Sequence, residues 1–137
     1  MKLDQKLVDA VKDFIEERFP DGEDFKGAAG AYTKSGKILI SSSPLMPNAC
    51  VDVCHETGMI CEAFKIDEEI TASICLSRAK GKHLVLSPCG VCMERLFSYG
   101  PNVEVGVPNL EEPTKWEAKK LSDAHPYYWK NIFPEEK

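Results

Sequence analysis

The chain has 137 residues, 43% of them hydrophobic, and this size predicts a single domain over residues 1–137 with its own core. Its 22 acidic and 17 basic residues give a net charge of -5, and the basic residues are dispersed, which argues against nucleic acid as a partner. No apolar run reaches the roughly eighteen residues of a membrane span, and the first residues lack a signal-peptide pattern. We therefore expect a cytoplasmic protein with no membrane partner.

The first half of the chain predicts a helix, a hairpin and a second helix. Apolar residues recur at three- and four-residue steps over residues 3–19, as in an amphipathic helix. Residues 25–33 and 37–42 predict two strands joined by a turn at 34–36. After a proline-containing loop, residues 54–64 predict a helix whose apolar face carries Met59, Ile60, Ala63 and Phe64.

The second half predicts strands over 70–76 and 103–107, a short apolar run over 83–87, and helices over 89–99 and 116–121, the last one short and charged. The aromatic tail, residues 125–133, is expected to pack on the body, on a neighbouring subunit or over a ligand. Strands that alternate with helices, after an initial hairpin, indicate an α/β fold with a mixed sheet.

Six cysteines without a secretory signal favour metal binding, catalysis or core packing over disulfides. Three have apolar neighbours in the sequence: Cys50, Cys61 and Cys75. The other three, Cys54, Cys89 and Cys92, lie at the starts of two predicted helices. These three are the candidates for chemistry.

Cys89 and Cys92 are three residues apart, so both thiolates project from one side of a first helical turn and can hold one metal ion. Cys54 would supply the third ligand of a catalytic zinc site, with one position left for a water whose pKa falls from its much higher value in bulk water to about 7. Glu56, two residues after Cys54, can direct its carboxylate at that position and move protons.

Other interpretations of these residues stay open. The C-x-x-C sequence also occurs as a redox pair and in structural zinc knuckles. Cys61 could close a four-cysteine site, although two helical turns place it about 11 Å beyond Cys54. His55 could replace Cys54 as a ligand, which would leave Glu56 directly adjacent.

The motif pair C-x-E and P-C-x-x-C, which stands here as Cys54-His55-Glu56 and Pro88-Cys89-Gly90-Val91-Cys92, resembles the cytidine deaminase superfamily. The segments Phe25–Ala29 and Gly36–Lys37 follow that family's strand and turn without gaps. The resemblance implies a three-layer α-β-α sandwich with a five-stranded mixed sheet, and a homotetramer. It also implies three zinc ligands, Cys54, Cys89 and Cys92, and a catalytic Glu56.

The resemblance also locates candidate substrate contacts. The family position of Phe25 implies that its side chain faces the edge of the substrate ring; the alternative is a core phenylalanine. Ser43 and Leu45 stand where the family's Asn and Glu hold the ribose hydroxyls, so a carboxylate acceptor for the sugar is missing. Asn48 is either a replacement polar contact or a turn residue.

Two arginines that balance the thiolates in that family are replaced here by Thr57 and Met93. Arg95 and Arg78 are the candidates to supply this positive charge. The departures around the sugar make the chain similar to the blasticidin S deaminase branch of the family at least as much as to enzymes that act on cytidine.

The first hypothesis is therefore a zinc-dependent hydrolytic deaminase of a cytosine nucleoside or analogue, of the cytidine, deoxycytidine or blasticidin S type. The alternative is a non-catalytic, zinc-stabilised module that binds a nucleoside or a protein. A third class, the nucleic-acid deaminases, shares the motifs but conflicts with the net charge of -5.

Overall fold

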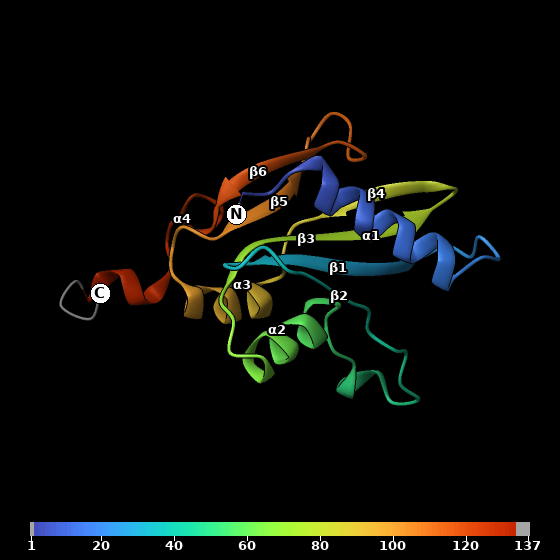
Figure 1. Cartoon of the computed structure of the whole chain (residues 1–137). Coiled ribbons are helices and arrows are strands. Elements are labelled where there is room, and N and C mark those ends of the chain that lie inside the picture. The colour runs from blue at the N-terminus through green and yellow to red at the C-terminus, as the bar shows by residue number, and fades with distance from the viewer. Residues whose placement is uncertain (1, 134–137) are drawn as a thin grey trace.

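In the computed structural model, which describes residues 2–133, a mixed sheet lies between α1 on one face and α2 and α3 on the other (Figure 1). The strands are β1 (Lys26–Thr33), β2 (Ile38–Ser41), β3 (Ile70–Ala79), β4 (Lys82–Leu86), β5 (Glu104–Pro108) and β6 (Trp116–Lys120). The helices are α1 (Gln5–Arg18), α2 (Glu56–Lys65), α3 (Gly90–Leu96) and α4 (Leu121–Ala124), with short 3-10 turns at Ala49–Val51, Phe97–Tyr99 and Trp129–Ile132. The predicted α/β class with a mixed sheet and three layers is confirmed.

The strand order is β2-β1-β3-β5-β6, and β4 pairs with the second half of β3. Only β3 and β5 run parallel, with Ala72 opposite Glu104; the other neighbours are antiparallel. The sheet thus has six strands rather than the expected five. The additional strand is β6, because residues 116–120 pair with β5 instead of forming the predicted charged helix.

The helix predicted for residues 116–121 was wrong, because backbone pairing with the distant strand β5 outweighs the local helix propensity. The loop between β5 and β6 is closed by Asn109, whose side chain accepts hydrogen bonds from the backbone N–H groups of Glu111 and Glu112. This turn returns the chain alongside β5, with Gly106 opposite Ala118. A short, charged strand suits the edge of a sheet, where exposed charges discourage pairing with other chains.

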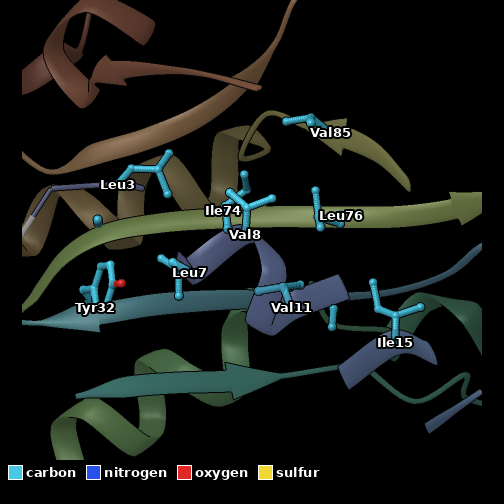
Figure 2. Packing of buried hydrophobic residues seen from close by; sticks show 11 residues of the cluster. Leu3, Leu7, Val8, Val11, Ile15, Tyr32, Ile74, Leu76 and Val85 are labelled. Carbon is cyan, nitrogen blue, oxygen red and sulfur yellow. The ribbon is translucent and has the colours of Figure 1, made fainter. Parts of the chain in front are cut away.

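Alternate residues of β1 face the two helical layers, as a strand requires. Ala28 and Tyr32 pack against α1 in one cluster, whereas Ala29 and Ala31 pack against α2 in another. Figure 2 shows the α1 side, where the helix's apolar stripe lies over β1 and β3: Leu7, Val8, Val11 and Ile15. The small residues of β1 let both helices approach the sheet closely.

On the other face, α2 buries Met59 and Ala63, as its periodicity predicted. Phe64 is 87% exposed, so its assignment to the apolar face was wrong. A step of 100° per residue carries Phe64 past the edge of the stripe that Ala63 occupies. Within residues 2–133, no helix has the length and apolar character that a membrane crossing demands.

The aromatic tail packs partly on the body, beside α3. The ring of Tyr128 stacks on Phe97, with centroids 3.8 Å apart and an interplanar angle of 2°. The Tyr128 hydroxyl and the Trp129 indole N–H both donate to the carboxylate of Glu94 on α3. Tyr127 is 93% exposed, so the tail presents one side to α3 and the other to solvent.

Candidate functional site

Two helix starts bring three cysteine sulfurs together on the face of the sheet that α2 and α3 cover. Cys54 lies just before α2, Cys89 is the N-cap of α3, and Cys92 is in the first turn of α3. Their Sγ atoms all lie within 4.8 Å of one another, and the Cys54 and Cys89 Sγ atoms are 3.3 Å apart. Tetrahedral zinc with bonds of about 2.3 Å to sulfur needs sulfurs about 3.8 Å apart. This donor set therefore fits zinc.

Glu56 is the first residue of α2 and is only 3% exposed, beside the sulfur cluster. Burial raises the pKa of its carboxyl group, because the charged form loses hydration. Its own backbone N–H, a hydrogen bond with Cys92 and the charge of Arg95 act in the opposite direction without cancelling the effect. A carboxyl group with a raised pKa is suited to exchange protons near neutral pH.

The thiols of the cluster have different pKa shifts. Burial raises the pKa values of Cys54 and Cys92. Burial also acts to raise the pKa of Cys89, but hydrogen bonds from the backbone N–H groups of Cys92 and Val91 and from the neighbouring thiols lower it below the usual value. Cys89 is therefore the thiol of the cluster most readily ionised.

Of the two arginines predicted to balance the thiolates, Arg95 lies at the site and Arg78 does not. The Arg95 guanidinium donates to the Thr57 hydroxyl at 3.0 Å, which links α3 to α2, and its charge lowers the pKa of Glu56. Arg78 is buried against the end of α1, where it contacts Glu16. Its candidacy was wrong because β3 turns that side chain toward the opposite face of the sheet.

His55 is oriented away from the sulfur cluster. Its Nδ1 accepts a hydrogen bond from the backbone N–H of Ser43 at 3.0 Å, and the Ser43 hydroxyl lies 3.0 Å from the same nitrogen. Burial lowers the pKa of the imidazole, in agreement with a neutral ring whose Nδ1 is an acceptor. His55 therefore joins the loop after β2 to the start of α2, and the geometry does not support it as a replacement for Cys54.

The remaining cysteines lie outside the cluster. Cys61 and Cys50 are exposed, so their apolar neighbours in the sequence do not place them in the core. Within residues 2–133, no fourth Cys, His, Asp or Glu joins Cys54, Cys89 and Cys92. A closed four-cysteine site that includes Cys61 is thus absent from the described part of the chain.

Two residues near the site were missed by sequence reasoning. Cys75, on β3, is buried, and its pKa is raised by burial and by the negative charges of Glu56, Cys54 and Cys89. Ser41, at the end of β2, accepts a hydrogen bond from the Met59 N–H and donates to the His55 carbonyl. Only the alternation of β3 could have indicated Cys75, and nothing local indicates Ser41.

A cavity of about 660 Å³ lies beside this loop, and Phe25, Ser43, Leu45 and His55 all line it. Phe25 is 80% exposed, so the alternative of a core phenylalanine was wrong; its contact with substrate stays a prediction. Asn48 does not line the cavity, and its side chain accepts the Cys50 N–H, which supports its interpretation as a turn residue.

The structure is similar to solved cytidine deaminases. The cytidine deaminase from Bacillus anthracis is 40% identical, with a TM-score of 0.86 over 96% of this chain and 93% of that one. Those from Burkholderia pseudomallei (19% identity, TM-score 0.69, 90% of this chain and 97% of that one) and Mycobacterium leprae (15%, 0.65, 87% and 97%) share the fold. No protein-family model and no curated protein sequence matches the chain.

Proposed function

This chain belongs to the cytidine deaminase superfamily, and from that membership we propose that it is a zinc-dependent hydrolytic deaminase of a cytosine nucleoside or nucleoside analogue. The reaction replaces the 4-amino group of the cytosine ring with oxygen from water and releases ammonia. The observation that carries the proposal is the convergence of three cysteine sulfurs within 4.8 Å beside the buried carboxyl group of Glu56.

Cys54, Cys89 and Cys92 would hold the zinc ion, which, when bound, supplies an activated water as the nucleophile. Glu56 is not one of the three donors, and its position in the first turn of α2 leaves its carboxyl group to move protons. It would take a proton from the attacking water and give it to the ring nitrogen next to the amine carbon. It would later deliver a proton to the departing ammonia.

The cavity that Phe25 lines favours, as substrate, an analogue with a modified sugar, such as a blasticidin S type compound, over plain cytidine. Ser43 occupies a family sugar position, but its backbone N–H and hydroxyl both engage His55. Leu45, at the other position, is 83% exposed and offers no hydrogen-bonding group. A homotetramer and a cytoplasmic location belong to the same proposal.

The test is a substrate panel of cytidine, deoxycytidine, cytosine and blasticidin S, followed by ammonia release and by the ultraviolet change, with the zinc content measured in parallel. Glu56→Gln is expected to retain zinc and to lose turnover by about 10²–10⁴-fold. The matched control is Glu62→Gln on the same helix, where Glu62 forms an ion pair with Lys65 on the surface.

Full turnover by zinc-loaded Glu56→Gln would contradict the role assigned to Glu56. A zinc-loaded wild-type chain that binds these compounds but releases no ammonia from any of them would instead favour the non-catalytic module.

A further inference from the structure

The cavity that Ser43 and Leu45 line is positively charged, unlike the protein as a whole. Among its lining residues are two cations, Arg18 and Lys26, and no carboxylate, although the chain as a whole has a net charge of -5. A negatively charged ligand is repelled by most of such a surface, so a local positive cavity wall is where it can bind.

The two cations converge on one side chain. The Arg18 guanidinium lies 5.0 Å from the centre of the Phe19 ring, and the Lys26 ammonium lies 5.5 Å from the same centre. An anion that binds near this ring would be attracted by both charges. The aromatic ring supports both cations through cation–π attraction, which keeps them in place when no ligand is bound.

Protein carboxylates compensate these cations only weakly. Lys26 lies 3.6 Å from the carboxylate of Glu23, whose side chain is 62% exposed, and a surface pair of this kind contributes little. Within residues 2–133, Arg18 has no carboxylate within ion-pairing distance. Asp21 and Glu23 line a neighbouring hollow with the same two cations, so an anionic ligand would compete with exposed carboxylates that attract them only weakly.

The three serine side chains of the cavity are already hydrogen-bonded. The Ser42 hydroxyl donates to the Gly27 carbonyl at 2.6 Å, and Ser41 and Ser43 bond to the backbone and ring of His55. These contacts leave Arg18 and Lys26 as the charged groups that a ligand can engage.

His55, which lies between Cys54 and Glu56 in the chain, lines the cavity, whereas the three sulfur ligands and Glu56 do not. A Cβ at Gly27 would come within 2.8 Å of His55 Nε2, so the start of β1 rests directly on that ring. Ser43 and Leu45, at the family's sugar positions, line the same cavity as Lys26, so a substrate whose sugar end lies there can extend toward Lys26.

We propose that Arg18 and Lys26 bind an anionic substituent, a carboxylate or a phosphate, at the sugar end of the cytosine-type substrate. This inference rests on the proposed function and replaces the missing ribose-binding carboxylate with a site of opposite charge. A neutral sugar gains little there, whereas an anion gains charge-assisted hydrogen bonds from both side chains.

The test compares cytidine with cytidine 5′-monophosphate and with the 5′-carboxylate of cytidine, so that the two sources of negative charge are separated. At low salt, kcat/KM for at least one anionic compound is expected to exceed that for cytidine by tenfold or more, and to fall as salt is added. Arg18→Gln and Lys26→Gln should each reduce that preference by roughly tenfold. The matched control is Lys6→Gln, on the exposed side of α1 and outside the cavity, which should keep the preference.

Binding to Glu56→Gln, measured by calorimetry with the same three compounds, separates the two proposals. Tighter binding of an anion that disappears in Arg18→Gln, without ammonia release from the wild type, would keep the anion site and remove the deaminase. Deamination of cytidine at a rate equal to that of both anionic compounds would overturn the anion site and leave the deaminase. A preference for anions that survives when Arg18→Gln and Lys26→Gln are combined in one variant would also overturn the anion site.

Discussion

The guanidinium of Arg78 on β3 forms an ion pair with Glu16 on α1, with Nη1 3.1 Å from Oε2. Its Nη2 donates to the carbonyl groups of Phe19, at 2.8 Å, and Glu23, at 3.3 Å. Arg78 is 1% exposed, and since its Nε has no hydrogen-bond partner in the described part of the chain, these contacts of Nη1 and Nη2 compensate its charge. It thereby fixes the turn between α1 and β1, the segment that carries the exposed Phe25.

Arg78→Met should lower the free energy of unfolding by about 2–4 kcal/mol, because the carbonyl groups that end α1 lose a buried donor and Glu16 keeps only His83 as a partner. Urea denaturation of the zinc-loaded protein measures the change. Lys82→Met, at an exposed position on β4, is the control and should change stability by no more than about 0.5 kcal/mol. An equal effect of the two substitutions would contradict a structural role for Arg78.

Asp4 caps α1 and should make the free energy of unfolding depend on pH in the acidic range. Its Oδ1 accepts the Leu7 N–H at 3.0 Å and the Tyr32 hydroxyl at 2.8 Å, and the Leu7 N–H, with help from Tyr32, lowers its pKa below 3.8. The ionised carboxylate therefore contributes its full stabilisation above pH 3.8, and the contribution is lost as the pH falls below this value through the lowered pKa of the folded state.

Asp4→Ala should lower the free energy of unfolding at pH 7 by about 1–2 kcal/mol. Asp4→Asn keeps a capping oxygen without the charge, so it should flatten the loss of stability between pH 4 and lower values while costing less at pH 7. Denaturation curves over this pH range measure both effects. An unchanged acid dependence in Asp4→Asn would show that other carboxyl groups carry it.

Gly30 lets α1 lie directly on β1. A Cβ at this position would come 2.4 Å from Val11 Cγ2 and 3.3 Å from Leu7 Cδ1, so Gly30→Ala should cost about 1–3 kcal/mol as the helix is displaced. Combining it with Val11→Ala should cost less than the sum of the two single changes, because the clashing methyl group is removed. Gly90→Ala, where a Cβ meets nothing within 4 Å, is the matched control. Strictly additive costs would contradict this packing.

The zinc content of single cysteine variants tests the donor set. Cys54→Ala, Cys89→Ala and Cys92→Ala should each reduce zinc well below about one ion per chain, because a site with three protein ligands tolerates the loss of one poorly. Cys61→Ala and Cys50→Ala change exposed thiols outside the cluster and should retain zinc. Loss of zinc from Cys61→Ala, with zinc retained by Cys50→Ala, would support the closed four-cysteine site instead.

Local pattern identified α1, α2 and α3, four of the strands of the sheet and the two helix starts that carry the cysteines, but not α4. It failed where pairing with a distant strand competes with helix formation for the same backbone groups. Residues 116–120 contain good helix formers, but their backbone groups pair with β5, as Gly106 opposite Ala118 shows. Phe64 failed differently, because one residue at the edge of an apolar stripe has no local signal for the side it faces.

The sequence by itself determined the donor types, their spacing within each turn and the family to which they belong. Only the tertiary structure decided that Cys54 and Cys89, 35 residues apart, have their sulfurs 3.3 Å from each other, that His55 bonds to Ser43, and that Arg78 serves α1. It also decided that Arg18 and Lys26 meet at the Phe19 ring. Spacing within one turn is set by the 3.6-residue period of the helix, whereas contacts between distant segments depend on which faces the sheet register brings together.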